Sequence, residues 1–324
     1  MKISVLIALS FFSSLTWAAG TVQTGTFSSE SLGVSKKFRV YLPQGYSENC
    51  CRYPVIYQLH GWGASQETWT GPGLRIQDAA DDMKLHAIIV MPDGDRSMYL
   101  DSATPVDYEA CMAEQIPKRN RTESRADFCV RKPKYATYII RDLIPYIDSV
   151  YRTIDKPSAR GISGESMGGF GAMQLAMRSQ QFGSVVSHSG GLSMLYKGPK
   201  PFQPGSAEVW SEVVHLPGRE EVEAALGDSI ENWRAHDPYS LAGKGVGVPL
   251  AIYFDVGTED EVGSYEMSMH FAERLTQLNI KHTFVEVPGG HHDDVYFVSR
   301  APIGLRFHVE QFNSAGVYPL LCAK

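Results

Sequence analysis

The stretch GISGESMGGFGAM, residues 161–173, contains five glycines and two serines in thirteen positions. Glycine costs conformational entropy in regular structure, so such a cluster indicates a tight and sterically crowded bend of the backbone. The residues before the bend, 158–163, have the pattern of a strand, and residues 168–180 after it have the pattern of a helix. The chain is therefore expected to turn sharply from a strand into a helix at this point.

Strands and helices alternate along most of the chain. Short apolar or alternating segments predict strands at residues 36–43, 53–60, 85–92, 158–163, 182–190, 249–257 and 281–290. Helical spacing predicts helices at residues 73–83, 135–152, 168–180, 266–280 and 291–312, with a kink or an early break at Pro145. Such alternation predicts an α/β fold with a mostly parallel sheet and helices on both of its faces.

The glycine-rich bend has the form G-x-S-x-G, centred on Ser166. A sharp strand-to-helix turn leaves no room for side chains on either side of the serine, which explains Gly164 and Gly168. The turn would raise Ser166 to the top of the sheet, with the N–H of Met167 at the start of the helix, where negative charge is favoured. This setting is typical of a nucleophilic serine.

A nucleophilic serine needs a histidine base and an acid that orients it, and in such sheets the acid and then the base follow the serine along the chain. The segment AIYFDVGTEDE, residues 251–261, supplies the acid. Asp255 still lies within the expected strand and is interpreted as structural. The loop position favours Asp260, with Glu259 as the alternative.

The base is expected in the loop after the next strand, within FVEVPGGHHDDVYF, residues 284–297. His291 lies just beyond a Gly-Gly turn and is the first candidate, with His292 beside it. The run HHDD also contains metal-ligand types, but it lacks the spaced third ligand that a closed site needs. We therefore expect neither a metal nor another cofactor.

A second backbone donor for a developing oxyanion is expected in the loop after the early buried strand. The segment YQLHGWG, residues 57–63, is an apolar strand that ends in this loop. The N–H of Trp62 is the candidate, because Gly61 and Gly63 leave it accessible. Together with the N–H of Met167 it would form an oxyanion hole.

Several motifs in order along the chain resemble those of one known group. They are LHGWG, MPDG, SMYLDS, YIIRDLIPYID, GESMGGFGAM, HDPYSLA, YFDVGTED and FVEVPGGHH, which together span about residues 35–310. They resemble the esterase-D and antigen-85-like branch of the α/β-hydrolase superfamily, which includes feruloyl and acetyl-xylan esterases, S-formylglutathione hydrolases and mycolyltransferases. The resemblance implies an α/β-hydrolase fold and implies that Ser166 is the nucleophile, Asp260 the acid and His291 the base. It likewise implies that Met167 and Trp62 are the oxyanion donors.

Two features depart from the pattern of that group. The segment 102–133 is polar, is bounded by cysteines and is longer than expected, and HHDD replaces the usual single histidine followed by an aromatic residue. This segment and the Pro- and Gly-rich residues 192–217 both follow strands, at the edge where α/β folds bind ligands. Both are therefore candidates for a lid.

The first 18 residues have a lysine, an apolar run and small residues, which is the layout of a secretory signal peptide cleaved after Ala18. Residues 19–324 would then be one α/β-hydrolase domain, secreted or periplasmic, with no membrane span. Export makes disulfides possible among the five cysteines, Cys50, Cys51, Cys111, Cys129 and Cys322. A Cys111–Cys129 pair would close the polar segment between them.

The 324 residues carry a net charge of −6 without a block of basic residues, which argues against nucleic-acid binding. The sequence thus predicts a secreted serine carboxylesterase that acts on small-molecule or carbohydrate-linked esters without a cofactor. Two alternatives remain open: an acyltransferase that passes the acyl group to a sugar or lipid hydroxyl, and a non-catalytic exported binding protein.

Overall fold

The computed structural model describes residues 19–102, 112–113, 134–214, 220–244 and 249–318. The expected signal peptide, residues 1–18, and the expected Cys111–Cys129 pair lie outside the described residues. Cys50 is an exposed free thiol.

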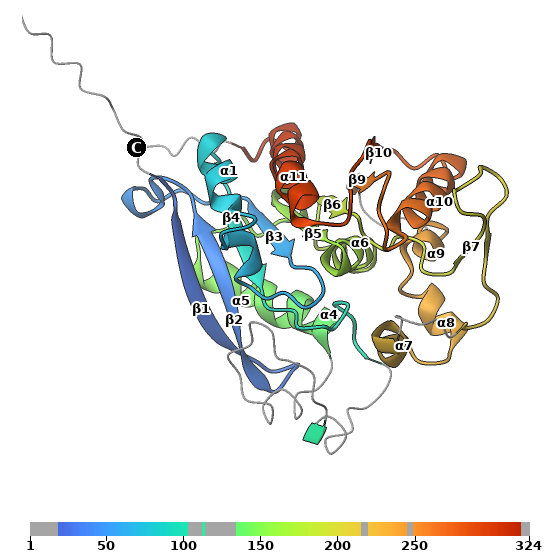
Figure 1. Cartoon of the computed structure of the whole chain (residues 1–324). Helices are drawn as coiled ribbons and strands as arrows, with labels where there is room; N and C mark the ends of the chain where they lie inside the picture. The colour runs from blue at the N-terminus through green and yellow to red at the C-terminus, as the bar shows by residue number, and fades with distance from the viewer. Residues whose placement is uncertain (1–18, 103–111, 114–133, 215–219, 245–248, 319–324) are drawn as a thin grey trace, which may run out of the picture.

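An eight-stranded sheet forms the centre of the molecule (Figure 1). Its strands, in spatial order, are β1 (Thr21–Ser29), β2 (Val34–Leu42), β4 (Ile88–Pro92), β3 (Val55–Leu59), β5 (Arg160–Glu165), β6 (Ser184–His188), β9 (Ala251–Gly257) and β10 (His282–Val287). The pairs β1–β2 and β2–β4 are antiparallel, and every later pair is parallel. The carboxyl ends of six strands therefore meet at one edge, where parallel α/β sheets bind their ligands.

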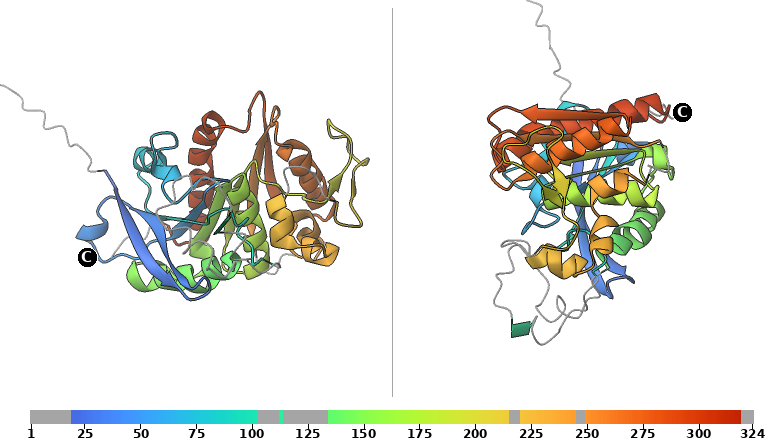
Figure 2. Two further views of the ribbon diagram at one scale, coloured as in Figure 1. Left: turned by 60° about the horizontal axis from the view of Figure 1, so that its bottom comes forward. Right: turned by 90° about the vertical axis from the view of Figure 1, so that its right-hand side faces the viewer.

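Helices cover both faces of this sheet, as Figure 2 shows from two further directions. One face carries α1 (Ile76–Asp82) and α11 (Asp294–Ser314). The other carries the run α4 (Tyr135–Thr137), η3 (Tyr138–Leu143) and α5 (Ile144–Val150), followed by α6 (Met167–Ser179), α9 (Pro238–Ala242) and α10 (Ser264–Gln277). The smaller helices are η1 (Tyr46–Glu48), η2 (Thr68–Thr70), η4 (Pro157–Ala159), α7 (Glu220–Leu226) and α8 (Ile230–Arg234). The predicted fold class is confirmed.

Strand β3 shows why the central strands are apolar throughout. Val55, Tyr57 and Leu59 pack into the core on the α6 side, whereas Ile56 packs into the core on the α1 and α11 side. Successive side chains of a strand point to opposite faces, so a strand covered on both sides buries every residue. The continuous apolar run in the sequence is the direct consequence.

The helix expected over residues 135–152 is helical to Val150, and Pro145 does not end it. Instead the wider π-helical turn Tyr138–Leu143 comes immediately before the proline, which occupies the first turn of α5. A proline lacks an N–H and its ring clashes with the carbonyl four residues earlier. The π turn accommodates the proline by changing the hydrogen-bond register.

Strand β1 was not among the strands expected from the sequence. It pairs along its whole length with β2, from Thr21 opposite Leu42 to Ser29 opposite Val34. Residues 192–217 contain a small two-stranded sheet of β7 (Tyr196–Lys197) and β8 (Glu208–Val209). Within the described residues, no helix combines the length and apolar character that a membrane crossing requires.

Candidate active site

The turn between β5 and α6 holds Ser166 in an unusual backbone conformation, with φ 51° and ψ −118°. A Cβ atom on Gly164 would lie 2.3 Å from the carbonyl carbon of Gly168, and one on Gly168 would lie 2.6 Å from the carbonyl oxygen of Leu59. Both positions therefore require glycine, as the sequence predicted. The bend places Ser166 at the carboxyl edge of the sheet, directly before the first turn of α6.

The side chain of Ser166 lies at one end of a short hydrogen-bonded chain. Its Oγ is 2.8 Å from Nε2 of His292, and Nδ1 of the same imidazole is 2.8 Å from Oδ2 of Asp260. An ionised carboxylate only accepts hydrogen bonds, so Nδ1 carries the proton and Nε2 is left to accept from the serine hydroxyl. The imidazole is thus oriented and has the tautomer that a general base needs.

The structure corrects the expected position of the histidine by one residue. His291 lies outside the chain of hydrogen bonds, with its side chain 52% exposed and its ring nitrogens 3.6 Å from Glu259 and from Glu261. His292 is 12% exposed and faces Ser166. The physical reason lies in the turn: Gly257 and Gly290 pack backbone to backbone, so a Cβ on Gly257 would be 2.1 Å from the oxygen of Gly290. Because Gly290 is held against β9 by this contact, the side chain that points toward Ser166 is that of His292 and not that of His291.

Asp260 follows β9, and its side chain is fully buried. Its Oδ1 accepts the backbone N–H groups of Val262 and Ser264, each over 3.1 Å, while Oδ2 accepts from His292. Burial alone would raise the pKa of this carboxyl, but the hydrogen bond and charge of His292 and the N–H of Ser264 outweigh it and hold the pKa below its usual value. Asp260 is therefore ionised. Glu259, the alternative acid, is 62% exposed and turns toward His291.

The loop that follows β3 brings Trp62 close to Ser166. The carbonyl oxygens of Leu59 and His60 press against Gly168, so the end of β3 lies directly on the start of α6. Met167 is the first residue of α6, and its N–H therefore has no carbonyl partner within the helix. Trp62, Ser166 and Met167 line one cavity.

A buried polar network holds this loop against the segment after β4. Nε2 of His60 accepts the N–H of Gly94 at 2.9 Å, and its Nδ1 donates to the carbonyl of Gly61 at 2.8 Å. Tyr99 donates its hydroxyl proton to the carbonyl of His60 and accepts the His60 N–H, both at 3.1 Å.

Ion pairs hold the segment after β4 as well. Lys36, whose side chain is fully buried, forms ion pairs with Asp93 at 2.6 Å and with Asp95 at 3.1 Å. A buried hydrogen-bonded network of this kind favours a single loop conformation.

The cavity beside Ser166 has a volume of about 360 Å³. Much of its wall is apolar and flexible, since four methionines contribute to it: Met98, Met167, Met194 and Met267. Phe170 and Val262 add further apolar surface, and Tyr196 and Lys200 come from the segment 192–217 that was expected to border the site. Methionine side chains adapt to irregular shapes, so this wall suits an apolar group of variable outline.

A second histidine–aspartate pair lies close by but outside this cavity. His188 at the end of β6 donates from Nδ1 to Oδ1 of Asp255 at 2.9 Å. Asp255 also accepts from the hydroxyls of Tyr253 and Tyr296, at 3.0 and 2.6 Å, and from Nε of Arg300 at 2.9 Å. These bonds join β6 and β9 to α11, which is a structural role.

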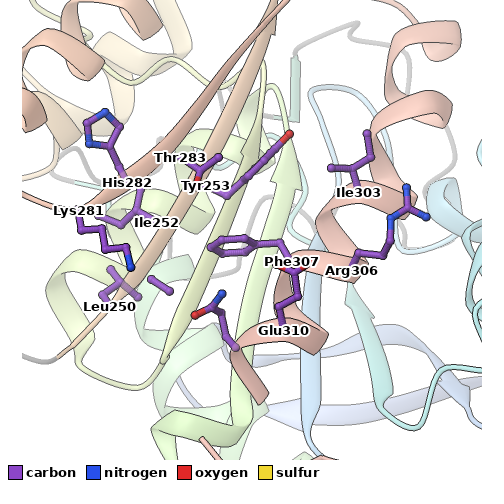
Figure 3. A pocket seen from close by; sticks show the side chains of 12 residues that line it. Leu250, Ile252, Tyr253, Lys281, His282, Thr283, Ile303, Arg306, Phe307 and Glu310 are labelled. Carbon is purple, nitrogen blue, oxygen red and sulfur yellow. The ribbon is translucent and has the colours of Figure 1, made fainter. Parts of the chain in front are cut away.

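A separate hollow of about 460 Å³ lies between β9, β10 and α11 (Figure 3). Its lining residues, among them Ile252, His282 and Phe307, come from the amino ends of the two strands and from the middle of α11. The hollow is thus at the end of the strands opposite Ser166, and it is lined by none of the residues in the hydrogen-bonded chain that starts at Ser166. Among the described residues, His, Cys, Asp and Glu side chains form no group of three that could hold a metal ion.

The family model described as "Putative esterase" matches residues 29–303. The esterases MT1326 and Rv1288 of Mycobacterium tuberculosis are each 29% identical over 277 residues, which cover 82% of this chain and 54% of theirs. An endo-1,4-beta-xylanase/feruloyl esterase of Xylanibacter ruminicola is 30% identical over 183 residues, which cover 54% of this chain and 22% of that protein. The chain spans about half the length of the two mycobacterial relatives.

Two solved structures resemble the fold over nearly its whole extent. A ferulic acid esterase superposes with a TM-score of 0.65 at 22% identity and covers 91% of this chain and 99% of its own. An S-formylglutathione hydrolase from Agrobacterium tumefaciens superposes with a TM-score of 0.66 at 20% identity and covers 90% of this chain and 96% of its own. The predicted α/β-hydrolase fold is confirmed by these superpositions.

Proposed function

The chain belongs to the esterase family, and from this premise we propose that it is a secreted serine carboxylesterase that hydrolyses acyl esters. The observation that carries the proposal is the pair of 2.8 Å contacts that join Ser166 to His292 and His292 to Asp260. A serine hydroxyl is a weak nucleophile unless an oriented base removes its proton. Family membership matches the resemblance on which the sequence prediction rests.

In the proposed reaction, Oγ of Ser166 attacks the ester carbonyl while its proton passes to Nε2 of His292. His292 then gives this proton to the departing alcohol, which leaves an acyl group on Ser166. A water molecule, deprotonated by the same imidazole, attacks the acyl-enzyme and releases the acid. The Asp260 carboxylate stabilises the imidazolium at both stages and keeps Nδ1 protonated.

The carbonyl oxygen becomes an oxyanion in each tetrahedral intermediate, and we assign its stabilisation to the N–H groups of Met167 and Trp62. The positive end of α6 supports this assignment, because Met167 opens that helix immediately after the nucleophile. The ordered contacts of the His60 loop support it on the other side. Fixed donors of this kind stabilise the transition state without reorganising during the reaction.

The proposed substrate has an apolar group that fits the methionine-rich cavity of about 360 Å³. Two comparison proteins are named feruloyl or ferulic acid esterases, so an aromatic acyl group is one member of this class to test. The proposal includes export, which the pattern of residues 1–18 supports. If cleavage occurs after Ala18, the mature protein begins at Ala19, and mass spectrometry of the exported protein would show this terminus.

The decisive experiment compares the unaltered protein with Ser166→Ala on p-nitrophenyl esters of rising acyl length and on methyl ferulate. We expect the substitution to lower kcat by roughly 10³-fold or more in a folded protein and to abolish labelling by a fluorophosphonate. Retention of a tenth of the activity would exclude Ser166 as the nucleophile. Product analysis with an added alcohol separates hydrolysis from acyl transfer, and a protein without turnover or labelling would be a binding protein instead.

A further inference from the structure

Glu165 precedes the nucleophile, yet the reaction proposed above does not use it. The residue is only 5% exposed and ends β5, where its backbone pairs in register with His188. Its Oε1 accepts the N–H of Gly61 at 3.1 Å. Its Oε2 is buried and has no hydrogen-bond partner among the described residues. Burying a carboxyl oxygen without a hydrogen-bond partner lowers the stability of the folded protein. The position of Glu165 therefore calls for a functional explanation.

The partner of Glu165 is the backbone immediately before the expected oxyanion donor. A Cβ on Gly61 would lie 3.2 Å from Cγ and from Oε1 of Glu165, so the glutamate side chain packs directly on this backbone. The amide N–H of Trp62 belongs to the peptide group that follows Gly61. An acceptor on the N–H of Gly61 therefore holds the peptide group directly before the one that carries this donor.

The other contacts of this loop act on different atoms. Tyr99 binds the N–H and the carbonyl of His60, and the His60 ring binds the carbonyl of Gly61. Glu165 supplies the hydrogen bond to the N–H of Gly61. The loop is thus held from the segment after β4 through His60 and from the nucleophile strand through Glu165.

The charged and titratable groups around Glu165 come from several elements. His60 follows β3, Tyr99 follows β4, His188 ends β6 and Asp294 begins α11. Burial is the largest influence and raises the pKa of Glu165 to about 7, although the N–H of Gly61 and the charge of His60 lower it. Both the neutral and the ionised form of Glu165 are thus populated near pH 7, and each form has an acceptor oxygen for the N–H of Gly61.

We propose that Glu165 is a positioning residue that holds the N–H of Gly61 and thereby aims the N–H of Trp62 at the oxyanion. This rests on the proposed function, because it concerns the same reaction. It extends that function by a side chain that touches neither the substrate nor the base. The acceptor oxygen at residue 165, rather than its charge, carries the effect.

The test compares Glu165→Gln, which keeps an acceptor oxygen, with Glu165→Met, which fills similar space without an equivalent one. We expect Glu165→Met to lower kcat by about 10²-fold with KM changed by less than about threefold, the pattern of a lost oxyanion donor. Glu165→Gln should recover most of that loss. Equal kcat values in the two variants would overturn the proposal.

A matched control separates positioning from general stability. Asp142 also accepts a backbone N–H, that of Ser31 at 2.9 Å, but it lies outside the cavity beside Ser166. Asp142→Met should lower the melting temperature without a change in kcat. Binding of a trifluoromethyl ketone, which forms an oxyanion on Ser166, should weaken in Glu165→Met and not in Asp142→Met. Equal weakening in both variants would also overturn the proposal.

Should Glu165→Met fail to fold, the hydrogen bond itself can be followed in glycine-labelled protein by NMR. The amide shift of Gly61 should titrate near pH 7 in the unaltered protein and stay constant in Glu165→Gln. A Gly61 shift that reports no titration of Glu165 at any pH between about 4 and 9 would contradict the contact. Absence of esterase turnover in the unaltered protein would instead refute the proposed function. Failure of the Glu165 proposal and failure of the proposed function are therefore distinguishable.

Discussion

His292 and His188 each donate an Nδ1 proton to a buried aspartate, over 2.8 Å to Asp260 and 2.9 Å to Asp255. The two pairs differ at the other ring nitrogen. Nε2 of His292 meets the hydroxyl of Ser166, whereas Nε2 of His188 packs against Gly304 of α11, where a Cβ would lie only 2.9 Å away. A buried His–Asp pair is therefore not a catalytic signature until the second nitrogen faces a reacting group.

The aspartates differ as well. Asp255 lies inside β9 and binds two tyrosine hydroxyls and Arg300 in addition to His188. Asp260 lies in a loop, and its Oδ1 accepts two backbone N–H groups. Both carboxyls have a pKa below the usual value, since their hydrogen-bonded and charged partners outweigh the effect of burial. Ionisation alone thus does not distinguish the pair beside Ser166 from the structural pair.

The largest expected effect is on activity and concerns Asp260. We expect Asp260→Asn to lower kcat by about 10³- to 10⁴-fold, because an amide can hold the wrong tautomer of His292. The melting temperature should change little, since the loop keeps its backbone contacts. Steady-state kinetics and thermal unfolding measure the two quantities. A variant with normal kcat would place the orienting acid elsewhere.

Asp255→Asn should lower stability and leave activity nearly unchanged, the reverse of Asp260→Asn. We expect the free energy of unfolding to fall by about 3–5 kcal/mol, because Arg300 would lose its buried counter-charge. Turnover per folded molecule should stay within about tenfold of the unaltered value. Denaturant unfolding and active-site titration would report these outcomes, and a kcat loss as large as that of Asp260→Asn would make the two pairs functionally equivalent.

Glu165 directly precedes Ser166 and pairs across the sheet with His188, and its pKa is shifted in the opposite direction to those of the two aspartates, from 4.5 to about 7. A carboxyl whose pKa is raised on folding binds its proton more tightly in the folded state. Its stabilising contribution is therefore complete below pH 4.5 and is lost as the pH rises through 7. We expect the unaltered protein to lose about 3 kcal/mol relative to Glu165→Gln between pH 4 and pH 8. Denaturant unfolding at several pH values measures the difference, and a constant difference would contradict the raised pKa.

The smallest expected effect is that of His291→Ala. The side chain is half-exposed and only approaches two exposed glutamates, so kcat should stay within about threefold of the unaltered value. His292→Ala, made in parallel, should lose activity as severely as Ser166→Ala. If the two histidine variants showed the reverse pattern, the pairing of His292 with Ser166 would not be the catalytic one.

The alternation of strands and helices after residue 35 and the bend at Ser166 were predictable because they depend on local patterns. Apolar runs mark strands buried on both faces, and a G-x-S-x-G turn between a strand and a helix is typical of a nucleophilic serine. The choice between His291 and His292 depends on where the backbone of Gly290 meets that of Gly257, which is a contact between two distant segments. A usable signal was Asp293, whose side chain caps α11 and fixes the start of the helix directly after His292.

Two other features could not be predicted for related reasons. The contact between Glu165 and Gly61 joins residues 104 positions apart and leaves no periodic pattern. Strand β1 exposes many of its side chains, and its threonines and serines resemble those of a loop. Only its pairing with β2 makes it a strand.

The backbone conformation of Ser166 lowers the stability of the folded protein. A residue other than glycine at φ 51° and ψ −118° carries conformational strain of roughly 1–3 kcal/mol, which the packing around Gly164 and Gly168 must sustain. Glycine at position 166 would relieve that strain and yield a more stable protein with no nucleophile. Selection for stability alone would therefore drive this position away from serine. In the proposed reaction this strained serine supplies the nucleophile, so catalysis and stability make opposite demands on position 166.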